Sequence, residues 1–329
     1  MNLEKQLYNL DNKRIKTKAR YKAKMQSDAS KNHLKNGIYV PKMHLSKNQS
    51  LLRYGLSWLY NGFLIVENEL VMAVDPGPDF LYRLQISKIN PSWINSLFIS
   101  HAHIDHYASA NVLLDWLVRA NQKVSIFAPE EVFKEGHISK YHAVGGYSES
   151  GFKTIDLTKL NKNKESYSIK TGLMITPVEL FHGVECYGFI LSTSTRKRRI
   201  GYLSDTGYAK KVHYSKGDYD IENKEVPKGE FIKYLDKREN IKKAFENVDV
   251  LIANIESFKH TKNSKTHVCL IDVIDILNKA KTKKIILTHI NPVGELLYDD
   301  WSKKIAKYTE QSTAIKTYTN NISGLKVYL

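Results

Sequence analysis

The sequence predicts an α/β fold in which helices cover β-sheets. Short apolar runs of strand length come first, and strands alternate with helices in the later part of the chain. This succession is typical of sheets whose faces are covered by helices. The 329 residues contain no internal repeat at the period of a solenoid or a propeller. Their number is sufficient for one large core or for two moderate domains.

The N-terminal segment differs in composition from the rest of the chain. The formal net charge is +16, and residues 1–53 contribute +10 of it, with thirteen Lys or Arg against three acidic residues. Its apolar residues predict a helix with a narrow apolar stripe, formed by Leu3, Leu7, Leu10 and Ile15. We therefore expect a basic arm over residues 1–50, ahead of a folded domain over residues 51–329. Such an arm either contacts a polyanion or remains a solvated tail.

Strands are predicted from short apolar runs that end in turn residues. The first two, 62–67 and 70–75, form a hairpin-like pair that ends in the turn "DPGPD". Further strands are expected at 93–100, 123–129, 173–181, 186–194, 199–205, 248–255 and 283–289.

Helices are predicted where apolar residues recur at helical spacing, over 108–120, over 268–280 and around 301–308. Residues 137–151 include a Gly-Gly pair and are expected to form a loop. Residues 209–240 are highly polar and show no clear period. They predict an inserted loop or a small lid.

A cluster of metal-ligating side chains follows the strand predicted at 93–100. The stretch "FISHAHIDHYAS", residues 98–109, places four such residues within six positions, in a chain with only 12 histidines: His101, His103, Asp105 and His106. Four adjacent polar side chains after a buried strand are difficult to satisfy without an ion. The cluster therefore predicts a metal centre.

Three further candidate ligands also follow apolar strands. His182 follows "VELF", Asp205 follows "IGYLS", and His289 follows "IILT". Strand ends hold loop residues rigidly, and sites are commonly built there. Seven groups are too many for one tetrahedral zinc ion, and they suit two ions that share a carboxylate.

The motif "HAHIDH" resembles the H-x-H-x-D-H signature of the metallo-β-lactamase superfamily. The order "VDPGPD", "HAHIDH", His182, "SDTG" and "LTHIN" is also similar to that superfamily, over residues 54–329. The resemblance implies a four-layered αββα sandwich. It also implies that residues 51–329 form a metal-dependent hydrolase domain.

The resemblance divides the ligands between two divalent metal ions. One ion would be held by His101, His103 and His182. The other would be held by Asp105, His106 and His289. Asp205 would bridge the two ions. Asp75 matches an aspartate in the family's early D-x-G turn and would orient the ligands without binding a metal itself. Zinc is the expected metal, and the same ligands also suit manganese and iron.

Two further stretches resemble ribonuclease Z within that superfamily. "NIESF" (254–258) is similar to its H-E-A-T-F segment, although Ile255 stands where that family has a histidine. Residues 266–291 are similar to its histidine-bearing helix and the strand that follows. The resemblance implies that His267 donates a proton to the leaving oxygen in phosphodiester cleavage with help from Glu256, while Asp105 orients or deprotonates the attacking water.

The substrate is left open between several classes. Only 22 residues separate His182 from Asp205, which leaves no room there for the long arm with which ribonuclease Z grips tRNA. We therefore expect a phosphodiesterase acting on RNA or nucleotides, with a 3′,5′-cyclic-nucleotide phosphodiesterase as the alternative. A lactonase or thioesterase is more distant. A nucleic-acid-binding protein with a vestigial site is the alternative from a different class.

The composition of the chain indicates in which cellular compartment the protein works and whether it contacts a membrane. No apolar stretch approaches the roughly 18 residues that a membrane span requires, and the N-terminus has no apolar signal core. The two cysteines, Cys186 and Cys269, lie in apolar patterns and are expected to be small buried hydrophobes. We therefore expect a cytoplasmic protein without a membrane partner. A homodimer is possible, because related folds often dimerise.

Overall fold

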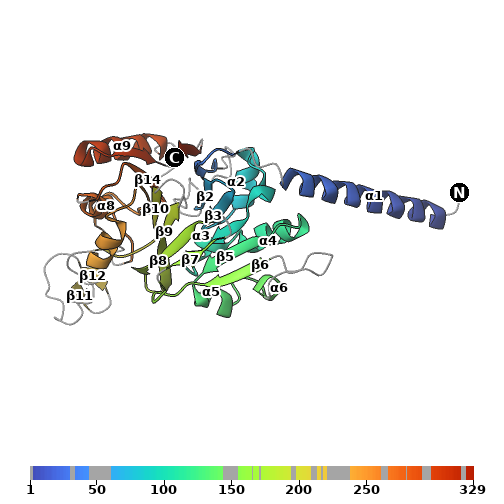
Figure 1. Cartoon of the computed structure of the whole chain (residues 1–329), viewed down its shortest axis with the longest axis horizontal. Coiled ribbons are helices and arrows are strands. Elements are labelled where there is room, and N and C mark those ends of the chain that lie inside the picture. The colour runs from blue at the N-terminus through green and yellow to red at the C-terminus, as the bar shows by residue number, and fades with distance from the viewer. Residues whose placement is uncertain are drawn as a thin grey trace.

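The fold is a sandwich of two β-sheets between layers of helices, which confirms the predicted αββα class (Figure 1). Each of the two large sheets has seven strands. The computed structural model describes residues 3–29, 34–43, 61–143, 155–164, 166–169, 172–193, 198–208, 213–215, 218–220, 238–260, 266–278, 280–290, 298–319 and 324–329.

The first sheet contains the predicted hairpin at its centre. Its strands lie in the order β16 (Leu325–Tyr328), β1 (Gly37–Val40), β2 (Phe63–Glu67), β3 (Leu70–Val74), β4 (Ser96–Phe98), β5 (Val124–Ala128) and β6 (Ile155–Lys159). Strands β3 to β6 are parallel, whereas β1 pairs antiparallel with β2 and β16. Strand β1 is therefore part of the sheet, although the sequence analysis placed its residues in the basic arm.

The second sheet changes from antiparallel to parallel pairing. Its strands lie in the order β15 (Lys316–Thr319), β14 (Lys284–Thr288), β13 (Val250–Asn254), β10 (Arg198–Leu203), β9 (Glu185–Thr193), β8 (Met174–Phe181) and β7 (Tyr167–Ser168). Strands β7 to β10 pair antiparallel, and β10, β13, β14 and β15 pair parallel. The parallel strands carry their carboxyl ends to one edge of the sandwich.

Aromatic side chains fill the space between the two sheets. The ring centroids of Phe98 and Phe189 lie 4.6 Å apart, and those of Phe63 and Tyr202 lie 5.1 Å apart. All four side chains are buried. Burying a side chain of this size stabilises the fold by roughly 1.5–3 kcal/mol. The core therefore fixes the two sheets against each other, and with them the loops at their edge.

Helices cover the outer faces through apolar stripes. On the first sheet lie α2 (Phe80–Ile86) and α4 (Ala110–Arg119), and α4 buries Leu113, Leu114 and Leu117 at helical spacing. On the second sheet lie α8 (Leu270–Leu277), α9 (Tyr298–Thr313) and the helical residues 238–245. Strands and helices predicted from the sequence at these places are thus present, within a few residues.

Several short elements complete the described chain. They are η3 (Pro91–Trp93), α3 (Ile104–Tyr107), α5 (Glu130–Lys134), α6 (Lys140–Ala143), β11 (His213–Ser215) and β12 (Asp218–Asp220). Helix α6 occupies the start of the expected loop 137–151, whose residues beyond 143 lie outside the described ones. Most of the expected insertion 209–240 also lies outside them, apart from the β11–β12 pair and the helix that begins at 238.

The N-terminal helix α1 (Leu3–Ala29) projects away from the sandwich (Figure 1). The helix predicted in the basic arm is therefore present, and it is longer than the apolar positions alone indicated. Among the helices that the structure describes, none combines the length and the apolar character needed to cross a membrane. Cys186 and Cys269 are free and buried, as predicted.

Candidate metal centre

The seven candidate ligands lie together where strands of both sheets end. His101 and His103 follow β4, and α3 carries Asp105 and His106 directly after them. From the second sheet, His182 follows β8, Asp205 follows β10, and His289 follows β14. Residues far apart in the sequence thus meet because the strands that precede them end at the same edge of the sandwich.

The donor atoms form two adjacent groups. In each group all ligand atoms lie within 4.8 Å of one another; the first contains His101, His103 and His182, and the second contains Asp105, His106, Asp205 and His289. Asp205 also contacts the first group, because its Oδ2 lies 3.8 Å from His182 Nε2 and 3.3 Å from His106 Nε2. One carboxylate oxygen therefore faces both groups.

Buried partners behind the ligands orient two of the imidazoles. His106 Nδ1 lies 2.8 Å from Asp75 Oδ2, and His182 Nδ1 lies 2.6 Å from the carbonyl oxygen of Thr266. Each Nδ1–H donates to its acceptor, which directs each Nε2 into the site. Asp75 is itself held by Ser100 and by the Tyr202 hydroxyl at 2.6 Å.

Two residues of the centre have an unusual backbone conformation. Asp75 has φ 45° and His289 has φ 58°, in the left-handed region that residues other than glycine seldom adopt. Such conformations persist only where the surrounding structure enforces them, and they cluster at functional sites. The strain therefore supports a functional role for this edge of the sandwich.

The donor set fits divalent metal ions. His101 Nε2 is buried and has no hydrogen-bond partner among the described residues, while its Nδ1 lies 2.9 Å from Ser100 Oγ. His182 Nε2 and His103 Nδ1 point at each other across 3.0 Å. Burial lowers the pKa of His182 to about 4 and that of His101 well below its usual range. Both are neutral imidazoles, the state in which histidine binds a metal.

The carboxylates of the second group are ionised. Burial alone would raise the pKa of Asp205, but the neighbouring His289 and His106 hold it well below its usual range. Burial likewise opposes ionisation of Asp105, and the contacts with His106 and His289 outweigh it, so its pKa is also lowered. His289 Nε2 lies 3.1 Å from Asp105 Oδ2. Two negative charges are thus held among imidazoles, an arrangement that attracts cations.

The sequence analysis missed the residue that orients Asp205. Asn254, at the end of β13, donates from Nδ2 to Asp205 Oδ1 at 2.9 Å, and Thr288 Oγ1 donates to Asn254 Oδ1 at 2.7 Å. With Oδ1 engaged in this way, Oδ2 is the oxygen left for the ligand groups. The available signal was a polar residue closing the apolar run "VLIAN", where a buried amide requires a partner.

His267 lies against the centre, and Glu256 lies near it. His267 Nε2 is 3.4 Å from Asp205 Oδ2, and its ring is 4.8 Å from that of His182. It precedes α8, which begins at Leu270, so it occupies a turn and not the helix. Burial lowers its pKa, but the contact with Asp205 and the charge of Glu256 outweigh this and raise it. Its position suits either a proton donor or a further ligand.

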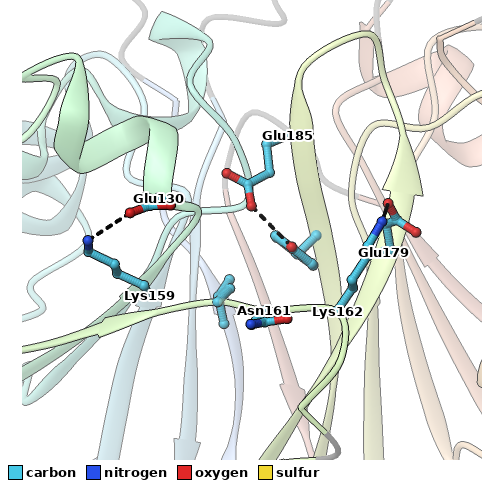
Figure 2. A pocket seen from close by; sticks show the side chains of 8 residues that line it. Glu130, Lys159, Asn161, Lys162, Glu179 and Glu185 are labelled. Atoms are coloured by element: carbon cyan, nitrogen blue, oxygen red, sulfur yellow. Dashed lines mark hydrogen bonds and ion pairs between the residues drawn. The ribbon is translucent and has the colours of Figure 1, made fainter.

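A pocket of about 400 Å³ opens beside the β8–β9 turn (Figure 2). Its two lysines both contact glutamates: Lys159 Nζ lies 2.9 Å from Glu130, and Lys162 Nζ lies 3.5 Å from Glu179. A smaller pocket of about 190 Å³ is lined by residues 179–187, which include His182. In the larger pocket, the charges of Lys159 and Lys162 are offset by carboxylates, so these two lysines are poor anchors for a phosphate.

Comparisons with known proteins agree with this geometry. A family model described as the beta-lactamase superfamily domain matches residues 72–218. An uncharacterised protein of Methanocaldococcus jannaschii is 30% identical over 269 residues, which cover 82% of this chain and 86% of that protein. Ribonuclease Z of Pyrococcus furiosus is 25% identical over 180 residues, which cover 52% of this chain and 50% of that enzyme.

A solved structure supports the fold independently. The metallo-beta-lactamase fold protein YhfI from Bacillus subtilis is similar with a TM-score of 0.59 and 15% sequence identity. The similarity covers 88% of this chain and 99% of that protein. At this identity the match concerns the fold alone.

Proposed function

This chain belongs to the metallo-β-lactamase superfamily, a family of metal-dependent hydrolases, and we propose that it is a dinuclear phosphodiesterase that acts on RNA. One observation carries the proposal: Asp205 Oδ2 faces both groups of ligand atoms, with His267 directly beside it. A shared carboxylate between two groups is what a pair of ions requires. The similarity to ribonuclease Z of Pyrococcus furiosus supports phosphodiester chemistry.

In this proposal the two groups hold one ion each. His101, His103 and His182 would hold the first, and Asp105, His106 and His289 would hold the second, with Asp205 available to both. Two divalent ions, most readily zinc, would supply positive charge for the phosphate oxygens and acidify a water molecule. The neutral His101 and His182 and the ionised Asp105 and Asp205 are in the states in which these groups bind a metal.

In the proposed reaction, side chains around the ions orient the attacking water and transfer the proton to the leaving oxygen. Asp105 is ionised, because its pKa is lowered, and its carboxylate can therefore accept a hydrogen bond from the attacking water and orient it. His267 donates the proton on Nε2 to the leaving oxygen, an effect typically worth about 10²–10⁴ in rate. Glu256 supports the protonated form of His267 through its negative charge.

A second candidate is hydrolysis of 3′,5′-cyclic nucleotides. The chain between His182 and Asp205 is occupied by β9 and β10, which form a hairpin, so a long substrate-gripping arm has no place there. A small phosphodiester would reach the centre without such an arm. The two candidates share the same ligands and differ only in what lies outside the centre.

The test is a substrate panel combined with metal analysis. Bis-p-nitrophenyl phosphate, 3′,5′-cyclic AMP, a short single-stranded RNA and a tRNA precursor are incubated with the protein loaded with Zn or Mn. Cleavage of RNA and two ions per chain are expected, and Asp205→Ala should abolish cleavage and lose at least one ion. Cleavage restricted to the cyclic nucleotide supports the second candidate. A protein that holds no metal and binds RNA without cleaving it would instead be a binding protein with a vestigial site.

A further inference from the structure

Helix α1 has no buried face along the residues whose side chains are described. The large apolar side chains described on it are exposed, with exposed fractions of 68% for Tyr8, 62% for Leu10, 55% for Ile15 and 65% for Tyr21. Figure 1 shows the helix extending outward from the sandwich. Most helical stability in proteins comes from packing one face against a partner. Helix α1 contacts η3 of its own fold, but the described side chains between residues 8 and 24 have no packed face there, which suggests a partner outside the fold.

The charge of α1 is concentrated in its second half. Seven of the residues from 13 to 24 are basic, and no acidic residue lies between 12 and 27. Residues three and four positions apart are neighbours on a helix surface. The cations therefore form two rows, one of Lys13, Lys16, Arg20 and Lys24, and one of Arg14, Lys18 and Lys22. Tyr21 lies between the rows.

We propose that α1 binds the phosphate backbone of RNA and thereby holds the substrate of the metal centre, an inference that rests on the proposed function. Two rows of cations match a ligand with a repeated negative charge. Phosphate contacts from Lys and Arg position a protein on a nucleic acid without reading its sequence. Tyr21 provides an exposed ring between the rows on which a base can stack.

Two other partners fit the helix less well. A membrane surface requires one continuous apolar face. On α1, Tyr8 and Ile15 share one side, whereas Leu10 and Tyr21 share another, with cations between them. A second copy of α1 would bring the same cations together, and like charges at such distances repel. A polyanion turns the same charges into attraction.

The salt dependence of binding measures the contacts directly. Each phosphate contact contributes about 0.7 to the slope of log K against log salt for single strands. Removing three contacts lowers the slope by about 2, which corresponds to about a 100-fold loss of affinity at 0.1 M salt. The test variant replaces Lys13, Lys16 and Arg20 with glutamine. Glutamine is a good helix former, so the helix is retained.

A matched control carries the same loss of charge elsewhere. It replaces Lys303, Lys304 and Lys307 with glutamine; these three lysines are exposed on α9. Both full-length proteins are loaded with metal and titrated with a fluorescent single-stranded RNA of about 20 nucleotides over a salt series. Its phosphorothioate linkages keep the charge and slow hydrolysis. Hydrolysis of bis-p-nitrophenyl phosphate is measured in parallel.

We expect the α1 variant to show the lower slope and the control to resemble the unmodified protein. Both should hydrolyse bis-p-nitrophenyl phosphate normally, because neither alters the metal centre. Equal slopes in all three proteins would overturn the role of α1. So would a dimer that dissociates in the α1 variant without a change in RNA binding, or a preference for phosphatidylserine vesicles over RNA. If α1-dependent RNA binding persists while no phosphodiester is cleaved, the proposed function fails and this inference stands.

Discussion

Replacing Asn254 with leucine tests whether this residue sets the orientation of the shared carboxylate. Asn254 is buried, donates to Asp205 Oδ1 at 2.9 Å and accepts from Thr288 at 2.7 Å. Its Nδ2 also lies 3.2 Å from the Tyr202 hydroxyl. Leucine has a similar size and removes all three contacts. Asp205 can then rotate, so that Oδ2 no longer faces both groups.

The expected loss of metal affinity follows from the hydrogen bond between Asn254 and Asp205 that the substitution removes. A hydrogen bond to a charged group contributes about 1.5–3 kcal/mol. Because about 1.4 kcal/mol corresponds to a factor of ten in affinity, metal binding should weaken by about 10- to 100-fold. This agrees with the usual effect of removing a hydrogen bond to a metal ligand, which is also about 10- to 100-fold.

The assay is competition for Zn against a chelator of known affinity. The matched control is Thr309→Val, which removes a buried hydroxyl that donates to the Ile305 carbonyl at 2.8 Å on α9, away from the centre. Both variants should lose some stability, which melting of the metal-free proteins measures. Only N254L should lose metal affinity. Unchanged affinity in a folded N254L would refute the reasoning; if N254L does not fold, Thr288→Val removes the support of Asn254 more gently and decides the question.

Further variants separate the roles of individual residues. Asp205→Ala should abolish hydrolysis and reduce the metal content measured by mass spectrometry, and two retained ions would contradict the bridge. His267→Ala should keep both ions while turnover falls by about 10²-fold or more, less for p-nitrophenolate esters, whose leaving group needs little protonation; loss of metal would make His267 a ligand. Asp275→Ala removes the carboxylate that contacts Arg238, and because Asp275 is 31% exposed it should lower the free energy of unfolding in urea by about 1.5–3 kcal/mol. A change under 1 kcal/mol would show the pair to be dispensable.

The sequence predicted well which residues come together at the candidate centre, because they follow apolar runs. Such runs are recognisable as buried strands, and the residue after a buried strand must lie at a sheet edge. His182, Asp205 and His289 each follow a run of this kind, and the structure brings them beside the cluster at 101–106. The partition of these residues between two ions came from the family resemblance, and it remains a prediction.

The sequence predicted less well where a position depends on distant pairing. Strand β1 is a run of four apolar or small residues, Gly37–Val40, beside a lysine-rich helix, and its place in the sheet depends on pairing with β16 almost 300 residues away. Asn254 was visible as a polar residue in an apolar run. That it faces Asp205 follows from the parallel pairing of β10 with β13, which no local pattern reveals.

The distribution of positive charge argues that recognition of the substrate is separate from its cleavage. In the pocket beside the β8–β9 turn, Lys159 and Lys162 are matched with Glu130 and Glu179 (Figure 2), so this pocket offers little net attraction to a phosphate. Helix α1, which carries the basic rows, projects away from the sandwich (Figure 1) and has no acidic residue between positions 12 and 27. A small cyclic nucleotide would contact only the metal centre. An RNA long enough to reach α1 gains additional contacts there, and this difference favours RNA as the substrate.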